Sequence, residues 1–478
     1  MLFTEPAFLF VFLPALLGIH ALTPKRGRNL VLTLASLLFY AVGEMAFLPW
    51  LLASTALNYV VALGLDRWKG SERARVLLEL GIASDVLLLV AFKYGDLLIE
   101  AINVPAAYLH LGTAPLPGLV LPLGISFFTF HKISYKVDVY RGVAPVRRNP
   151  MDLLLYILLF PQLIAGPIVR YHEIAQDLVG RAIRLSDVAE GVRRFIMGMA
   201  KKMLVANTLA GAADPIFALP ANELSLPLIW TGLLCYAFQI YFDFSGYSDM
   251  AIGLGRMFGF SFPENFDFPY VSRSITEFWR RWHMSLSRWF RDYLYIPLGG
   301  NRISEPRTYL NLMIVFLLCG LWHGARWTFL LWGAFHGLAL TVERLSAARW
   351  LHQAPVIVGR LYTSVLLLVG WAVFRADSWT HLKVIVSTMM GRGAVLRVPH
   401  WPSEYVTVEV MLALALGLLS AVRPWALAWE RRENRRLTSS PGGAMGWLAE
   451  PAILGTLLVA SIARVAADTY NPFIYFRF

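Results

Sequence analysis

The sequence predicts an all-α, polytopic integral membrane protein, and three observations support this fold class. First, 57% of the residues are hydrophobic and only 15% are charged, whereas soluble domains carry about 25% charged residues. Second, apolar runs recur along the chain with lengths near the ~20 residues that a helix needs to cross a bilayer. Third, lysine and arginine gather in alternate loops between these runs, as the positive-inside rule describes for membrane proteins.

The apolar runs set the expected membrane segments, of which about 9–12 should enter the bilayer. The candidate runs are residues 6–22, 29–43, 47–64, 75–93, 119–137, 151–169, 226–244, 309–323, 327–345, 355–374, 405–421 and 446–463. Several are short, so some are expected to be re-entrant or tilted. The first run follows no basic region and no small-residue cleavage site follows it, which predicts a retained helix rather than a secretory leader.

Charge placement predicts the orientation. The net charge of +12 fits cytosolic loops beside anionic lipid better than nucleic-acid binding. Loops 43–46 and 102–119 contain no Lys or Arg, whereas basic clusters follow the first, third and fifth runs. These clusters are Lys25, Arg26 and Arg28; Arg67, Lys69, Arg73 and Arg75; and Arg141, Arg147 and Arg148. The N-terminus is therefore expected outside the cytosol.

Residues 247–308 are too polar to span. Within them, residues 276–295 place large apolar side chains at three- and four-residue spacing, which predicts one amphipathic helix lying in the cytosolic interface. Those side chains are Trp279, Trp282, Leu286, Trp289, Phe290 and Tyr293. His283 falls on the same apolar side, so its imidazole is expected to point into the protein.

The run LWHGARWTFLLWGAFHG, residues 321–337, holds a histidine near each end. His323 lies beside a glycine-flanked helix break, and ionisable groups at membrane depth face a cavity or a polar partner. The residues alone leave two interpretations open, a base with access to substrate and a structural histidine bonded to a neighbouring helix. On one continuous helix His323 and His336 would lie ~20 Å apart on different faces, so no shared metal is expected and His336 is interpreted as a packing or bridging residue.

Two further polar stretches have open interpretations. Asp243, Ser245 and Asp249 could line a polar tunnel, orient a catalytic imidazole, or form structural ion pairs with Arg256 or Arg280. The ion-pair interpretation is favoured for Asp249, and neither the functional nor the structural interpretation is favoured for Asp243. Lys132, Lys136 and Arg141 could attract a phosphate-bearing cosubstrate or snorkel to the interface. Cys235 and Cys319 lie in apolar runs outside any CxxC pair, so neither a disulfide nor a thiolate metal site is expected.

Several stretches in this order resemble the membrane-bound O-acyltransferase (MBOAT) family, most closely its bacterial branch of alginate O-acetyltransferase type. They are LPLGISFFTFHKISYKVDVYRG, FPQLIAGPIVR, FDFSGYSDMAIGLGRMFGFSFPENFDFPY, SITEFWRRWHMSLSRWFRDYLYIPLGGNR, WHGARWTFLLWGAFHG, GWAVFRAD and the terminal NPFIYFRF. The resemblance spans nearly the whole chain. It implies one membrane domain, residues 1–478, in the bacterial inner membrane around a central funnel or tunnel.

The resemblance also implies the chemistry. Acetyl-CoA is the expected donor on the cytosolic side, without a metal, and an extracytoplasmic partner enzyme is expected to pass acetyl groups to a polysaccharide such as alginate, cellulose or peptidoglycan. The family's catalytic histidine maps onto His323 and the branch's second histidine onto His283. Arg280, Asn301 and Trp322 are the residues expected to hold the donor, and Arg280, Asn301 or a backbone N–H are candidates for stabilising the oxyanion.

Other functions stay open at this point. A sister branch transfers D-alanine towards teichoic acid from a carrier protein. A proton-coupled saccharide transporter would use its histidines and aspartates as a proton relay, although no internal repeat is visible. A third possibility is a scaffold that anchors an extracytoplasmic enzyme. No nucleic-acid partner is expected in any of these cases.

Overall fold

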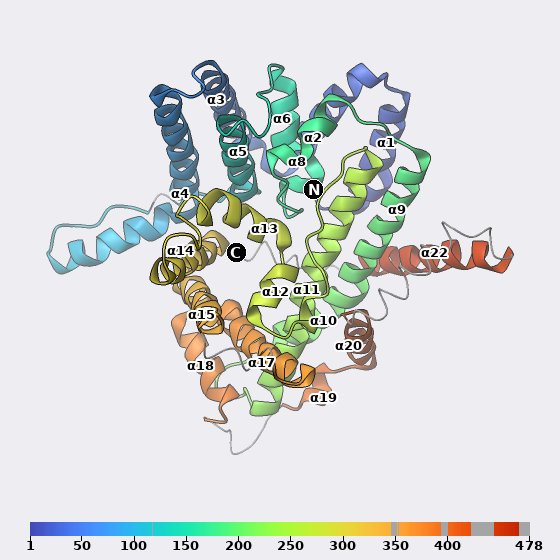
Figure 1. Cartoon of the computed structure of the whole chain (residues 1–478). Helices are drawn as coiled ribbons and strands as arrows, with labels where there is room; N and C mark the ends of the chain where they lie inside the picture. The colour runs from blue at the N-terminus through green and yellow to red at the C-terminus, as the bar shows by residue number, and fades with distance from the viewer. Residues whose placement is uncertain (117, 346–350, 352, 393–399, 422–443, 468–478) are drawn as a thin grey trace. The chain divides into compact units, whose positions relative to one another are not determined.

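The structure is a computed structural model that describes residues 1–116, 118–345, 351, 353–392, 400–421 and 444–467. These residues form helices joined by turns and contain no β-strand (Figure 1), which confirms the all-α membrane fold class. The chain divides into two compact units: unit 1 comprises residues 1–192 and 251–263, and unit 2 comprises residues 193–250 and 264–478. The single domain over residues 1–478 and the central tunnel stay predictions. The terminal NPFIYFRF motif lies outside the described residues.

Unit 1 is built from helices of the N-terminal part of the chain. Its elements are η1 (Phe8–Phe12), α1 (Leu13–Leu22), η2 (Lys25–Gly27), α2 (Arg28–Glu44), η3 (Met45–Phe47), α3 (Leu48–Arg67), α4 (Glu72–Tyr108), α5 (Ile125–Tyr140), α6 (Pro150–Leu158), α7 (Phe160–Leu163) and α8 (Tyr171–Val179). The helices α9 (Leu185–Ala200) and α11 (Leu226–Met257) contribute residues to both units.

Unit 2 contains the remaining elements. They are η4 (Lys201–Ala206), α10 (Asn207–Ala218), η5 (Pro269–Val271), α12 (Ile275–Arg281), α13 (Met284–Phe290), η6 (Arg291–Tyr295), α14 (Glu305–His323), α15 (Trp327–Arg344), α17 (Val356–Arg375), α18 (Trp379–Met389), α19 (Pro402–Tyr405), α20 (Val408–Ala421) and α22 (Ala444–Ala467).

Three described stretches are long and apolar enough to cross a bilayer: residues 25–67, which hold α2 and α3, then α17, and residues 449–467 of α22. Residues 8–22 and 408–419 form shorter apolar helices. The predicted runs mostly coincide with helices, but the run 151–169 does not form one helix. It breaks between α6 and α7 at Leu159, whose extended ψ of 108° precedes Phe160 and the helix-starting Pro161, because a proline is tolerated only in the first turn of a helix.

Helix α5 buries its cations inside unit 1. Lys136 is fully buried and pairs with Asp85 at 2.5 Å, whose other oxygen accepts a hydrogen bond from Asn58 at 2.8 Å. Lys132 is also fully buried and donates to the Ser54 hydroxyl at 2.5 Å. Both interpretations of these lysines were therefore wrong, because neither side chain reaches an anionic ligand at the surface or the membrane interface.

In unit 2, glycines let α9 and α11 approach closely. A methyl group built on Gly198 would lie 2.5 Å from the Gly246 carbonyl oxygen, and one on Gly246 would lie 2.7 Å from that of Gly198. Only hydrogen fits at such a crossing, and small residues are the usual means of packing membrane helices. The approach brings the basic residues of α9 and η4 against the carboxylates of α11.

Helices α14 and α15 form a tight antiparallel hairpin. Helix α14 ends at His323, and Gly324 follows in extended backbone before α15 begins at Trp327, so the predicted break is confirmed. Gly320 and Gly333 face the carbonyls of Phe329 and Phe316, where an added methyl group would overlap the oxygen.

The predicted helix over residues 276–295 is interrupted, so the prediction of one continuous helix was wrong. Helix α12 ends at Arg281, Trp282 is extended, and His283 has a left-handed backbone with φ 44° and ψ 50°. The free backbone groups at this break pair with residues 265–267: Met284 N–H donates to the Asn265 carbonyl and Asp267 N–H donates to the Arg281 carbonyl, both at 2.9 Å. The distant segment replaces the helical hydrogen bonds that the break removes.

Candidate active site

Three histidines of unit 2 alternate with three indoles in one buried set, which we call the His–Trp cluster. Its members are His283, Trp322, His323, Trp332, His336 and Trp279. Successive ring centroids lie 6.1, 4.9, 5.1, 4.9 and 5.3 Å apart in that order. The break between α12 and α13 supplies His283, and the α14–α15 hairpin supplies the other two imidazoles. Two separate sequence motifs thus meet in one place.

His323 is the half-buried member at the hinge of the hairpin. Its imidazole meets the ring of Trp332 nearly edge-on at 5.1 Å and that of Phe374 on α17 at 5.2 Å. The aromatic walls leave the ring in an apolar setting without burying it completely. The ring of His323 is therefore less buried than those of His283 and His336.

His283 is 1% exposed and lies against Phe244 of α11, with the ring centroids 4.7 Å apart. Its Nδ1 is 3.1 Å from the side-chain oxygen of Asn265. Burial lowers the pKa of the His283 imidazole to about 3, because a charged ring would lose its hydration there. The inward orientation predicted from its place on the apolar face is therefore confirmed, and the ring is neutral at physiological pH.

His336 is a supporting member of the cluster. Trp279 donates its indole N–H to Nδ1 of His336 at 3.3 Å, and His336 is 1% exposed. The hydrogen bond fits the packing or bridging interpretation of this residue. The indole of Trp332 contacts both His323 and His336 and lies between their rings. This arrangement agrees with the expectation that the two histidines do not share a metal.

The aspartates of α11 form ion pairs. Asp249 pairs with Arg194 at 2.9 Å and Lys201 at 2.6 Å, which agrees with the structural interpretation although the partners differ from those expected. Asp243 is buried and pairs with Lys202 at 2.6 Å. Both carboxylates neutralise cations of α9 and η4, an arrangement that stabilises this part of unit 2.

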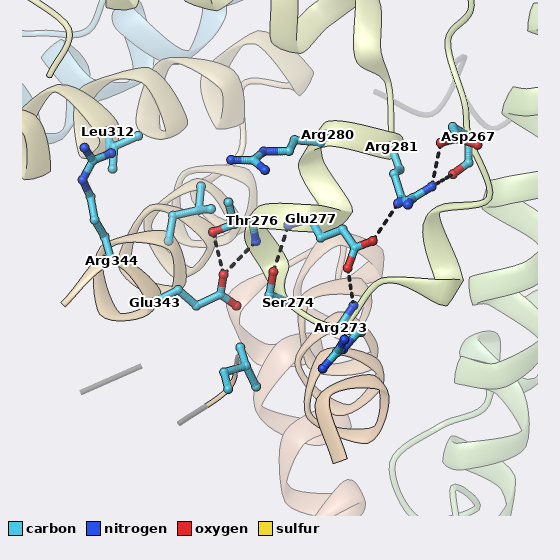
Figure 2. A pocket seen from close by; sticks show the side chains of 12 residues that line it. Asp267, Arg273, Ser274, Thr276, Glu277, Arg280, Arg281, Leu312, Glu343 and Arg344 are labelled. Atoms are coloured by element: carbon cyan, nitrogen blue, oxygen red, sulfur yellow. Dashed lines mark hydrogen bonds and ion pairs between the residues drawn. The ribbon is translucent and has the colours of Figure 1, made fainter. Parts of the chain in front are cut away.

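A cavity of about 670 Å³ opens beside the cluster, with walls from α12, α14 and α15 (Figure 2). Four arginines line it: Arg273, Arg280, Arg281 and Arg344. Arg281 is neutralised by Asp267 at 2.6 Å and Glu277 at 3.0 Å. Arg280 and Arg344 are exposed and make no ion pair with any residue that the structure describes. These two guanidinium groups are available to an anionic ligand.

The other residues expected to hold the donor have different positions. Trp322 is buried within the His–Trp cluster. Asn301 is exposed in the turn between η6 and α14, and the carbonyls of Leu298 and Gly300 in that turn accept hydrogen bonds from Asn311. Within the part of the chain that the structure describes, no hydrogen bond or ring contact joins Asn301 to the cluster, and its role in donor binding stays a prediction.

Sequence reasoning missed Asn265, Arg344 and Phe374 as site residues. Asn265 lies in a loop without periodicity. The side chains with which it forms hydrogen bonds are distant in the chain: Ser248 precedes it by 17 residues and Ser285 follows it by 20. Arg344 is the last residue of an apolar helix, where a cation usually complements the helix dipole. Asn265 and Phe374 do lie within two of the stretches that resemble the family, the one ending in PENFDFPY and GWAVFRAD, whereas Arg344 lies in neither.

An all-α membrane fold with buried imidazoles at a helix break, beside an arginine-lined cavity, defines the class as a membrane-embedded enzyme of group transfer. The sequence model of the membrane-bound O-acyltransferase family matches residues 117–356. The chain belongs to this family.

Comparison with its relatives indicates which kind of acyl group the chain transfers. The chain is 39% identical over 506 aligned residues to a protein of Azotobacter vinelandii named probable alginate O-acetylase AlgI, with 100% of both chains covered. It is 38% identical over 528 aligned residues to the protein of the same name from Pseudomonas aeruginosa, again with full coverage. It is 39% identical to a peptidoglycan O-acetyltransferase of Helicobacter pylori, covering 83% of this chain and 81% of the relative. The chain is accordingly a membrane O-acetyltransferase.

Proposed function

We propose that the protein transfers acetyl groups from cytosolic acetyl-CoA across the bacterial inner membrane for O-acetylation of an extracytoplasmic polysaccharide, with His323 as general base. The observation that carries this proposal is the position of His323, half-buried at the hinge of the α14–α15 hairpin and in ring contact with the cluster that contains His283. A base needs a lone pair that substrate can reach. The greater exposure of His323 favours it over His283 as the base.

The arginine-lined cavity supports a phosphate-bearing donor. Arg280 and Arg344 present guanidinium groups, which form strong charge-assisted hydrogen bonds with phosphate. Leu312 in the cavity wall precedes His323 by 11 residues on α14, a separation of about 16 Å along the helix axis. Coenzyme A carries its thioester at the end of a long flexible arm. Phosphates held in the cavity and a thioester at His323 are therefore compatible with one bound donor.

The proposed acyl transfer starts with a neutral imidazole at His323. His323 removes the proton from the acceptor hydroxyl while its oxygen attacks the thioester carbonyl. The tetrahedral intermediate then collapses, the carbon–sulfur bond breaks, and the thiolate of coenzyme A leaves and takes up a proton. Arg280, Asn301 or a backbone N–H stabilises the oxyanion in this proposal.

The acceptor is proposed from the relatives, whose names specify alginate and peptidoglycan. We propose a polysaccharide of this kind, reached through an extracytoplasmic acetyltransferase partner. The D-alanyl transferase of teichoic-acid type is the second candidate within the enzyme class, and it would require a carrier protein in place of acetyl-CoA. Family membership does not support the transporter or the scaffold.

The test uses the full chain in lipid nanodiscs with acetyl-CoA labelled on the acetyl group. Wild type should release thiol and consume label, and His323→Ala should lose about 10²–10⁴-fold in rate, the usual contribution of a general base. His323→Gln provides a second variant of closer size. His400→Ala is the matched control, because His400 lies at the surface in ion pairs with Glu404 and Glu223.

Each outcome has a defined meaning. Full activity of folded His323 variants would refute the assigned base. Transfer from carrier-bound D-alanine together with no use of acetyl-CoA would identify the second candidate. Label consumption that appears only after an extracytoplasmic fraction is added would support the partner enzyme, and consumption unchanged by any such fraction would count against it.

A further inference from the structure

The segment that closes the break between α12 and α13 also contacts the catalytic region through a side chain. Asn265 is 1% exposed, and its amide connects three groups from α11, the break and α13. Its nitrogen donates to the Ser248 hydroxyl at 3.0 Å. Its oxygen accepts from the Ser285 hydroxyl at 2.8 Å and from the Ser285 backbone N–H at 3.3 Å.

These contacts identify the two ends of the amide. A backbone N–H can only donate, so the atom facing Ser285 N is the side-chain oxygen of Asn265. The same oxygen lies 3.1 Å from Nδ1 of His283. A carbonyl oxygen has no proton to give, so in this hydrogen bond Nδ1 of His283 is the donor. In a neutral imidazole the other nitrogen, Nε2, then carries the lone pair.

We propose that Asn265 is a positioning residue that holds His283 in the Nδ1–H tautomer, so that Nε2 is the ring nitrogen that carries the lone pair. The tautomer stands on the hydrogen bonds alone, whereas its use in catalysis rests on the proposed function.

The backbone supports this assignment. His283 is one of three non-glycine residues with positive φ in the described chain, and such a strained conformation persists only where the surroundings impose it. The Met284 N–H to Asn265 C=O bond at 2.9 Å holds the same turn from the other side. Asn265 therefore fixes both the backbone position of His283 and the proton on its ring.

The experiment is nitrogen NMR on nanodisc-embedded protein carrying ¹⁵N-labelled histidine, with His283→Gln to assign the resonances. Wild type should show His283 protonated at Nδ1 and unprotonated at Nε2 from pH 5 to 8. Asn265→Asp should raise the midpoint of His283 titration by about one to three pH units, because an adjacent carboxylate favours the imidazolium. Ser285→Ala is the matched control: it removes another donor to the same oxygen and should leave the tautomer unchanged.

Activity supplies the second readout. Asn265→Asp should lower kcat by at least tenfold at pH 6 with little change in the KM for acetyl-CoA, and part of the loss should be recovered at pH 8. An Nε2–H tautomer in wild type, or a tautomer that both Asn265→Asp and Asn265→Leu leave unchanged, would overturn the proposal. The predicted tautomer with normal rates in all His283 and Asn265 variants would instead refute the catalytic use of His283 and leave the positioning by Asn265 intact.

Discussion

At the residue scale, His323 and His283 differ in what surrounds each imidazole. His283 is enclosed by Phe244, Asn265 and Trp322 and is neutral. His323 is half-buried between aromatic rings at the end of its helix. A buried ring with a strongly lowered pKa is a weak base, since general bases work best with a pKa near the operating pH. The greater exposure of His323 therefore supports the proposal that His323, rather than His283, removes the proton.

Donor binding is predicted to depend on Arg280 and Arg344, the two exposed arginines of the cavity, which make no ion pair with any residue that the structure describes. Replacing Arg280 or Arg344 with Ala should raise the KM for acetyl-CoA about tenfold or more, because a hydrogen bond to a charged group contributes about 1.5–3 kcal/mol. Label-transfer kinetics over a range of acetyl-CoA concentrations measure this, with kcat expected to fall less than KM rises.

The control for that prediction is Arg302→Ala. Arg302 is exposed in the turn between η6 and α14 and does not line the cavity, so its loss changes the net charge equally without removing a guanidinium from the cavity. An equal rise in KM for Arg302→Ala would show a general effect of charge and contradict a binding site in the cavity.

At the scale of elements, the α14–α15 hairpin depends on backbone contact. Gly333→Ala should destabilise the protein by about 1–3 kcal/mol, the usual cost of overpacking, because the new methyl group overlaps the Phe316 carbonyl and forces the two helices apart. The midpoint of thermal unfolding in nanodiscs measures the loss, and acetyl transfer should fall with it, since His323 lies at the hinge.

The matched substitution is Gly211→Ala in α10, where an added methyl group meets no atom within 4 Å. Alanine there should leave stability unchanged or raise it by about 0.5–1 kcal/mol, the helix preference over glycine. If Gly211→Ala and Gly333→Ala lowered the unfolding midpoint equally, close packing of the hairpin would not be the cause.

The same hairpin shows what local sequence determines. Its break was predictable because glycine beside His323 interrupts two apolar runs, and the observed helix bounds lie within a few residues of the predicted ones. The burial of His283 was predicted as well, but from the periodicity of a continuous helix that the structure interrupts at Trp282 and His283. The hairpin break depends on neighbours in the chain, so the sequence alone was enough to predict it.

Features that depend on distant segments were not predictable. The interruption at Trp282 and His283 exists because residues 265–267 take over the backbone hydrogen bonds, and no periodicity encodes that pairing. Lys132 and Lys136 resemble interfacial cations in the sequence, yet Asp85 and Ser54 on neighbouring helices satisfy them inside unit 1. Arg344 likewise joins the cavity only through the packing of α12, α14 and α15.

At the scale of the whole molecule, the proposed direction of transfer requires a defined membrane orientation. Helix α4 runs from Glu72 to Tyr108, and Figure 1 shows that it bends, so that its last part runs sideways from its first part. If the first part crosses the bilayer, the start of α4 and the loop that follows it reach water or the interface on different sides. Basic residues precede it and a loop without Lys or Arg follows it, which predicts a cytosolic start and an extracytoplasmic end.

Cysteine labelling checks this orientation, and the chain is well suited to it because Cys235 and Cys319 are both buried and can be replaced by Ala. Single cysteines introduced by Arg73→Cys and Thr113→Cys occupy exposed positions on either side of α4, and Arg302→Cys lies in the exposed turn before α14. In intact cells a membrane-impermeant maleimide should label only Thr113→Cys, and the other two should react after permeabilisation.

Labelling of Arg302→Cys from outside would contradict a cytosolic donor, since that turn leads directly into the helix that lines the cavity. Labelling of Arg73→Cys from outside would reverse the orientation of α4 and remove the charge argument on which the direction of acetyl transfer rests.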